Sequence, residues 1–174
     1  MKIKNLNYKI SNDKRGSFSK LLSYIQNKKL LKNKIKEVNI SISKKKGTLR
    51  GLHYQIGKYK EIKVIYCLSG RIFDVAININ EKSNDYLKKE INILDSKKNN
   101  FLIIPEDFAH GLQTLEQDTK ILYLSTNIHS VKFERRINPL DDHLSIKWPI
   151  QKKYVSKKDK NAPKIKIKKK RFNK

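Results

Sequence analysis

Residues 63–79 read KVIYCLSGRIFDVAINI, and this stretch indicates the fold. From Phe73 to Ile79, apolar side chains occupy every second position, which is the period of a β-strand. The preceding run, KVIYCLS, is also apolar, and the short turn signal SGR separates the two runs. Apolar runs joined by such short turns are typical of an all-β protein.

The same pattern continues on both sides of this stretch. In VNISIS, Val38, Ile40 and Ile42 fall on one face and polar residues on the other. Pro105 closes the run FLIIP, and proline suits the end of a strand because it cannot donate a ladder hydrogen bond. Turn signals separate these runs, so we predict an all-β sandwich or barrel. One weaker segment, SKLLSYIQNKKLL (19–31), has the spacing of a short helix.

The composition is strongly basic. The chain has 174 residues, most simply one domain, and a net charge of +25 from 41 Lys and Arg against 16 Asp and Glu. A polyanionic partner is one explanation. The lysines are spread along the chain among many asparagines and isoleucines, which favours a compositional bias at solvent-facing positions. We recognise no nucleic-acid-binding motif, and we expect no specific nucleic-acid partner.

The chain ends in a basic segment from about residue 164, KIKIKKKRFNK. Its one aromatic residue is Phe172, so we interpret residues 164–174 as a solvated, disordered tail rather than a phosphate-binding arm. Residues 1–163 would then form the folded domain.

The sequence also bears on redox state and location. The single cysteine, Cys67, excludes an intrachain disulfide, and we expect it to pack as a small hydrophobic side chain. We find no stretch long enough to span a membrane, and the first residues lack the apolar core of a signal peptide. We therefore expect a cytoplasmic protein without a membrane partner.

Two of the four histidines stand in distinctive settings. His53 lies in RGLHYQ, and His110 lies in IIPEDFAHG, just after a strand end. A metal site would need several converging ligands, but Gln55 occupies the position two after His53, and Glu61 is the nearest acid. We interpret the site as metal-free.

Acid–base chemistry is the second hypothesis, with histidine as a general base oriented by a carboxylate. Asp74 is close in sequence to His53, whereas Asp159 is distant but lies in a segment able to fold back. Lys63 leads the next strand, and Tyr123 stands in an apolar one where its hydroxyl needs a partner. A base, a lysine and a tyrosine around one cavity suit proton abstraction next to a carbonyl group.

Several motifs, in order along the chain, carry a resemblance to a known family. The ordered set resembles the dTDP-4-dehydrorhamnose 3,5-epimerases, which are RmlC-like cupins, and it covers roughly residues 10–163. The motifs are DKRGSF (13–18), RGLHYQ (50–55), KVIYCLSGRIFDVAI (63–77), IIPEDFAHG (103–111), ILYLST (121–126), DDHLSIKWP (141–149) and VSKKDKNAP (155–163).

The resemblance implies a cupin jelly-roll with an N-terminal arm and few short helices, a homodimer, and no cofactor or metal. It implies epimerisation at C3 and C5 of a nucleotide-linked 4-keto-6-deoxysugar, a step toward dTDP-L-rhamnose and surface polysaccharide. By resemblance His53 is the base, Asp159 its carboxylate partner, Tyr123 the proton donor and Lys63 the residue that stabilises the enolate. Asp74 then becomes a supporting residue.

The resemblance also implies a set of substrate-binding residues. Arg15 would reach across the dimer, and Arg50 and Lys158 would lie near the diphosphate. The other members of the set are Glu37, Asn39, His110, His129 and Glu134. Strict alternation would put Arg50 and His53 on opposite faces of their strand, so Gly51 must permit a bulge if both line one site.

The chain departs from the family pattern in three places. Lys20 replaces an acidic residue, His129 in NIHSV stands where an aromatic residue stacks on thymine, and RRINPLDD (135–142) replaces a tryptophan-containing motif. These departures fall in nucleotide or sugar recognition. Two alternatives therefore stay open: an epimerase acting at C3 or C5 alone, and a non-catalytic cupin that binds sugar or polyanion.

Overall fold

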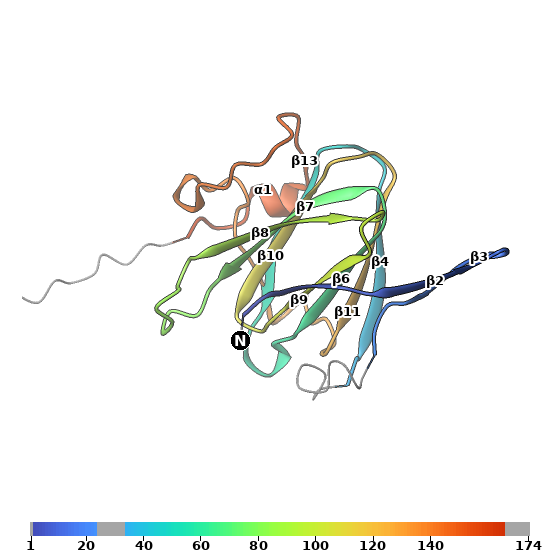
Figure 1. Ribbon diagram of the computed structural model, residues 1–174. Coiled ribbons are helices and arrows are strands. Elements are labelled where there is room, and N and C mark those ends of the chain that lie inside the picture. Colours follow the sequence, from blue (N-terminus) through green and yellow to red (C-terminus); the bar gives the residue numbers. More distant parts are fainter. Residues whose placement is uncertain (1, 24–33, 166–174) are drawn as a thin grey trace, which may run out of the picture.

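The computed structural model describes residues 2–23 and 34–165, which fold into two β-sheets packed face to face (Figure 1). The first sheet has the order β1 (Lys4–Asn7), β9 (Asn100–Ile104), β6 (Lys63–Ser69), β11 (Thr119–Ser125) and β4 (Glu37–Ser43). The second has the order β12 (Glu134–Arg136), β5 (Thr48–Gln55), β10 (Phe108–Thr114), β7 (Arg71–Asn78) and β8 (Lys89–Asp95), and β13 (Tyr154–Val155) also pairs with β5. The predicted all-β sandwich is confirmed.

Three short helices complete the elements of the described residues: η1 (Gly57–Tyr59), η2 (Asp142–Leu144) and α1 (Lys157–Lys160). None of the helices within these residues has the length and apolar composition needed to cross a membrane. The helix predicted over 19–31 falls mostly outside the described residues, and its first two residues, Ser19 and Lys20, belong to strand β3 (Gly16–Lys20).

The core between the sheets is built by side chains from both layers. Ile65 and Cys67 from β6 pack with Ile72 and Ala76 from β7, together with Leu112 from β10. Cys67 is free and buried, as predicted. Because β-strand side chains alternate, the inward face that holds Ile65 and Cys67 also carries Lys63, which lies at the open end of the sandwich and lines a cavity there.

The chain after β12 covers the outer face of the second sheet. Trp148 and Leu144 pack on Val75, Ile77 and neighbouring apolar residues of β5, β7 and β10. Asp74 and Ala76, on the opposite face of β7, point between the sheets instead of into solvent, and both are buried. Both faces of β7 are therefore buried, which agrees with the apolar character of residues 63–79.

Strand β5 contains the irregularity predicted at Gly51. His53 pairs with His110, and Arg50 pairs with Leu112. Between these two pairs β5 advances by three residues and β10 by two, so β5 contains one extra residue. Gly51 has φ +115°, and a Cβ there would meet Cα of Gly111 at 2.5 Å. The extra residue reverses the alternation, so Arg50 and His53 share one face and line the same cavity.

Strand β4 lies at the edge of the first sheet in an unexpected orientation. Its polar residues Glu37, Asn39 and Ser41 line the cavity, while Val38 and Ile40 are each 62% exposed on the outer face. Alternation predicted the two faces but not which of them faces inward.

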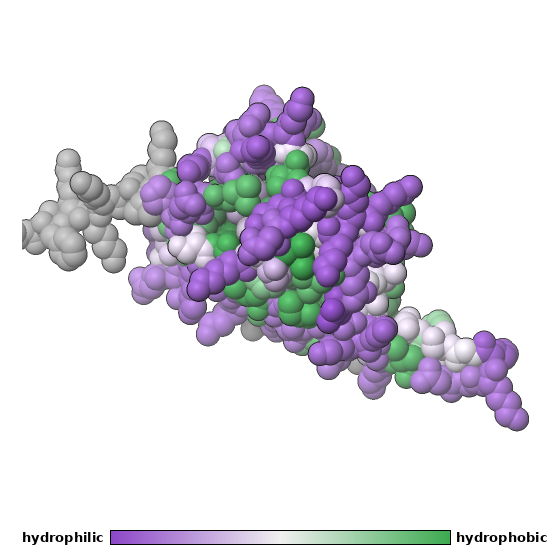
Figure 2. Space-filling view, turned by 90° about the horizontal axis from the view of Figure 1, so that it is seen from above, coloured by the Kyte–Doolittle hydropathy of each residue, from purple (hydrophilic) through white to green (hydrophobic). Residues whose placement is uncertain are grey.

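The hairpin of β2 (Lys9–Asp13) and β3 forms a separate two-stranded sheet that projects from the body (Figure 1). Figure 2 shows the same projection from above, with hydrophilic side chains around the rim of the visible face and hydrophobic residues gathered toward its middle.

Candidate active site

A cavity of about 880 Å³ opens between the two sheets, a size typical of small-molecule sites. Its walls carry both signs of charge in equal number. The basic residues are Arg50, Lys63, Arg136 and Lys153, and the acidic residues are Glu37, Glu61, Glu134 and Asp159.

His53 and Asp159, which stand 106 positions apart in the chain, meet at this cavity. Nε2 of His53 lies 2.7 Å from Oδ1 of Asp159. Asp159 is buried at the end of the first turn of α1, where Ser156 caps the helix by accepting the backbone N–H of Asp159. Burial raises the pKa of Asp159, but hydrogen bonds from His53 and Arg136 outweigh burial and lower it to about 2.

This contact selects the tautomer of His53. An ionised carboxylate only accepts hydrogen bonds, so Nε2 of His53 must carry the hydrogen that Asp159 receives. A neutral imidazole with hydrogen on Nε2 keeps its lone pair on Nδ1. His53 is therefore oriented as a base that accepts a proton at Nδ1.

Tyr123 and Lys63 come from the first sheet, opposite His53, and both line the cavity. Burial, followed by the nearby carboxylate of Asp74, raises the pKa of Tyr123 above its usual value, so the phenol stays protonated at neutral pH. Nζ of Lys63 lies 3.4 Å from the backbone oxygen of His53 and 3.5 Å from Oε1 of Glu61. Base and phenol therefore stand on opposite walls.

His110 forms a second histidine–carboxylate pair. Its Nε2 lies 2.6 Å from Oδ2 of Asp74, which is fully buried, and its ring contacts Tyr123 edge-on at 6.4 Å between centroids. Asp74, the partner of His53 suggested by sequence proximity, is therefore engaged elsewhere. The reason is geometric: strand β10 lies between β5 and β7, which separates Asp74 from His53 by two strand spacings.

One end of the cavity is built around the loop that carries His129. The side chain of Gln55 donates to the backbone oxygens of Tyr59 and Ile128 and accepts from the backbone N–H of Ser130. The side chain of Gln55 therefore links η1 to the loop that carries His129. Glu37 accepts the backbone N–H of His129 at 2.8 Å, which ties the loop to β4.

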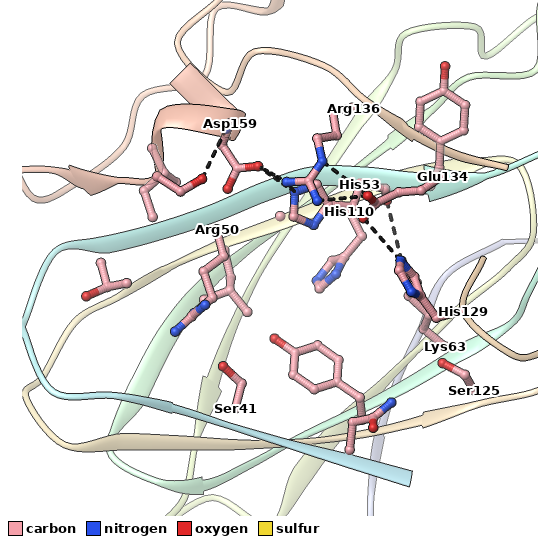
Figure 3. A pocket seen from close by; sticks show the side chains of 18 of the residues that line it. Ser41, Arg50, His53, Lys63, His110, Ser125, His129, Glu134, Arg136 and Asp159 are labelled. Carbon is pink, nitrogen blue, oxygen red and sulfur yellow. Dashed lines mark hydrogen bonds and ion pairs between the residues drawn. The ribbon is translucent and has the colours of Figure 1, made fainter. Parts of the chain in front are cut away.

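Two predicted binding residues complete this end. Nδ2 of Asn39 donates to Glu37, and Glu134 lies 3.6 Å from Nε2 of His129. Arg50 stands on the other side of the cavity (Figure 3), and its Nε donates to Oγ of Ser43.

The structure does not bring two of the predicted binding residues to the cavity. Lys158 is exposed on α1, because turning Asp159 inward directs the neighbouring side chain to solvent. Arg15 lies in the projecting hairpin, where its side chain is 91% exposed and pairs with Asp13 at 2.7 Å.

Arg136 lines the cavity and is not among the site residues predicted from the sequence. It lies directly opposite His53 in the pairing of β12 with β5. Its NH1 is 2.5 Å from Oδ1 of Asp159 and 3.0 Å from Nε2 of His53, and its NH2 is 2.8 Å from Glu134 (Figure 3). A sequence signal existed, because Arg136 stands two residues after Glu134 and shares its face of the strand.

Metal-ligating side chains do not gather at any point in the described part of the chain: no group of three or more His, Cys, Asp or Glu there has the geometry to hold an ion.

Comparison with known proteins places this arrangement in a family. A family model described as dTDP-4-dehydrorhamnose 3,5-epimerase matches residues 2–166. The dTDP-4-dehydrorhamnose 3,5-epimerase of Shigella flexneri is 35% identical over 90% of this chain and 87% of its own length. A dTDP-4-dehydro-6-deoxyglucose 3-epimerase from Streptomyces sp is 29% identical over 74% of this chain and 66% of its own.

A solved structure has the same fold. The dTDP-6-deoxy-D-glucose-3,5-epimerase of Legionella pneumophila Philadelphia 1, in complex with dTDP-4-keto-L-rhamnose, superposes with a TM-score of 0.87 at 32% identity. The match covers 93% of this chain and 87% of that one. The expected cupin jelly-roll is thereby confirmed.

Proposed function

Because the chain belongs to the dTDP-4-dehydrorhamnose 3,5-epimerase family, a family of isomerases, we propose that its cavity epimerises C3 and C5 of dTDP-4-dehydro-6-deoxyglucose. The observation that carries the proposal is the placement of a carboxylate-oriented base and a protonated phenol on opposite walls of one cavity. Inversion at carbon requires a proton to leave one face and return to the other. Two groups on opposite sheets supply that geometry.

The C4 ketone of the substrate acidifies the C–H bonds at both C3 and C5. In the proposed step, Nδ1 of His53 takes the proton, and the electron pair of the C–H bond moves into an enolate whose oxygen carries the charge. The ammonium group of Lys63 stabilises this oxygen. Tyr123 then donates its phenolic proton to the opposite face of the carbon, and solvent resets His53 and Tyr123. One base and one acid serve both centres if the ring shifts between the two steps.

Asp159 keeps its charge throughout this cycle. Its pKa of about 2 means that it does not take the proton from His53, so it acts by orienting the imidazole and stabilising the imidazolium. His110 and Asp74 lie on the same sheet as His53, and the ring of His110 contacts Tyr123 across the cavity.

Substrate binding is assigned to the residues around the reacting groups. Arg50 faces the diphosphate, for which its forked donors are suited. His129 stacks on the base, with Glu37, Asn39 and Glu134 around it. Lys158 stands outside the cavity wall, where its charge assists only at longer range.

A homodimer is part of the proposal, supported by the outer face of β4. Val38, Ile40 and Ile42 are all more than half exposed there and adjoin Leu122 and Leu124 of β11. An apolar sheet face of this kind marks an interaction surface. The projecting hairpin would then carry Arg15 toward the cavity of a second copy. This arrangement accounts for the position of Arg15 outside the cavity of its own chain.

The domain boundary and the location are also proposals. We assign residues 1–163 to one cupin domain and the remaining residues to a basic tail. The last described residue, Ile165, still donates its N–H to Asp141, and the rest of the tail lies outside the described residues. We place the protein in the cytoplasm, where nucleotide sugars are made.

The test is incubation of the protein with dTDP-4-dehydro-6-deoxyglucose in D₂O, followed by NMR of the sugar. The proposal expects deuterium at both C3 and C5 and accumulation of the epimerised sugar. If neither C3 nor C5 exchanges its proton, the result contradicts the proposal and favours a non-catalytic sugar-binding cupin.

Exchange at C3 alone defines a second candidate, a 3-epimerase. The similarity to the Streptomyces 3-epimerase favours this candidate, because both activities occur among relatives of this chain. The same NMR experiment separates the two, since each carbon is read independently.

A further inference from the structure

Arg136 is a charged group of the cavity that the proposed chemistry has not used. It stands on β12 opposite His53, and side chains of directly opposed residues in antiparallel strands are close neighbours. Its NH1 lies 2.5 Å from Oδ1 of Asp159, the same oxygen that accepts from His53. One carboxylate oxygen is thus shared between a guanidinium and an imidazole.

The second half of the guanidinium is also fixed. Its Nε and NH2 donate to Oε2 of Glu134 at 3.2 and 2.8 Å. Arg136 therefore bridges two carboxylates, one on its own strand and one on α1 (Figure 3). A planar guanidinium held at both ends is well suited to fix the position of Asp159.

The bridge has an electrostatic consequence for His53. NH1 of Arg136 lies 3.0 Å from Nε2 of His53, so a protonated His53 would place two positive charges in contact. Arg136 also partly neutralises the negative charge of Asp159, and this charge would otherwise stabilise the imidazolium form of His53. Both effects favour the neutral form of His53, which is the form able to accept a proton.

Other charged groups face His53 and set the balance. Lys63 on β6 places a second positive charge near the backbone oxygen of His53, and the carboxylate of Glu61 partly neutralises Lys63. Other charged or titratable groups that line the cavity with His53 are Asp159 on α1, Glu134 on β12, His110 on β10 with Asp74 behind it, Arg50 on β5, Tyr123 on β11, and His129 and Lys153 outside the strands. Of the basic groups among them, Arg136 makes the short contact with Nε2.

We propose that Arg136 is a positioning residue for the base: it shares the Asp159 carboxylate with His53, holding the carboxylate in place and opposing a second positive charge on the imidazole. The inference rests on the proposed function, in which His53 is the base. It predicts that the positive charge on β12 sets the pH below which the enzyme loses activity.

The test compares Arg136→Met with Arg135→Met. Arg135 is the neighbouring residue, exposed on the other face of β12, where its NH1 donates to the backbone oxygens of Lys132 and Glu134. Both variants remove one positive charge from the same strand. We expect the acid-side midpoint of kcat/KM to move upward by about one pH unit or more in Arg136→Met and to stay in place in Arg135→Met.

A charge-conserving variant and the measurement of KM distinguish a positioning role of Arg136 from a role in substrate binding. Arg136→Lys keeps the charge and should keep the midpoint near that of the wild type, and it serves as the folded variant if Arg136→Met does not fold. At pH values well above the acid-side midpoint, KM of Arg136→Met should differ from that of the wild type by less than about threefold, since Arg136 is assigned no contact with substrate. A rise in KM with an unmoved midpoint would instead make Arg136 a substrate-binding residue and overturn the inference.

NMR of the resting protein tests the inference independently of catalysis. Titration of ¹⁵N-labelled histidine follows the protonation of His53 without substrate. The inference expects protonation at higher pH in Arg136→Met than in wild type, even if the wild type proves inactive as an epimerase. Identical titrations of His53 in the two proteins would refute it.

Discussion

At the residue scale, the account depends on the hydrogen bond from His53 to Asp159. Replacing Asp159 with Asn removes the charge that stabilises the imidazolium and supplies an amide in place of a pure acceptor. We expect the exchange rate at C3 and C5 to fall about 100-fold or more, with little change in KM. Asp142→Asn is the control, because the side chain of Asp142 is 93% exposed. Equal rates in the Asp159 and Asp142 variants would contradict the assignment.

Asp159 also makes the stability of the protein depend on pH. Its pKa is about 2 in the folded chain against 3.8 for an unperturbed carboxyl. A lowered folded-state pKa contributes stability that is complete above pH 3.8 and is lost as pH falls toward 2. The contribution is about 2 kcal/mol. Urea unfolding from pH 5 to 2 should therefore show a shallower loss of stability in Asp159→Asn than in wild type, and parallel curves would argue against it.

Tyr123 separates abstraction of the proton from its return. In Tyr123→Phe the base still removes a proton, but the opposite wall has no phenol to deliver one. We expect deuterium to enter the unreacted substrate from the side of His53 while formation of the inverted sugar falls about 100-fold. NMR of substrate and product from one reaction measures both quantities. Undiminished inversion would remove Tyr123 as the proton donor.

At the element scale, the bulge at Gly51 brings Arg50 and His53 to one cavity. Gly51→Ala would place a Cβ 2.5 Å from Cα of Gly111 and 2.7 Å from the backbone oxygen of His110. Because both contacts are with backbone, β5 and β10 must separate. We expect a loss of several kcal/mol in the free energy of unfolding, and reduced activity in any folded fraction.

Gly16→Ala is the matched control for this prediction. Gly16 also has a positive φ, +139°, but a Cβ there meets no atom within 4 Å. The difference between the two variants in urea unfolding therefore measures the steric clash apart from the backbone conformation. Equal losses would mean that the close approach of β5 to β10 contributes nothing.

The elements also show what the sequence predicts and where it stops. Alternation predicts the strands, because it is a local property of the chain. The bulge at Gly51 is expected only after the family resemblance assigns Arg50 and His53 to one site. Alternation does not tell which face of β4 is inside, since that depends on the partner sheet: the apolar Val38 and Ile40 face outward. Proximity in sequence favoured Asp74 for His53, but strand order places β10 between them. Asp159 is the more distant of the two candidate carboxylates, and the resemblance to a family ranks it above Asp74.

At the scale of the whole molecule, the outer face of β4 supports assembly of two copies. Ile40→Lys places a charge on this face, so we expect the dimer to dissociate. Ile91→Lys is the control, because Ile91 is 49% exposed on β8, in the other sheet. Light scattering after size exclusion measures the mass of each variant. A dimeric Ile40→Lys protein would place the interface elsewhere.

The central claim is that one base, His53, removes the proton at both centres. The direct measurement is the time course of deuterium incorporation at C3 and C5 in D₂O, for wild type and His53→Asn at equal saturation with dTDP-4-dehydro-6-deoxyglucose. The account predicts exchange at both carbons in wild type and its loss at both in the variant, while the variant still binds the nucleotide sugar. Exchange that persists at either carbon in His53→Asn would contradict it.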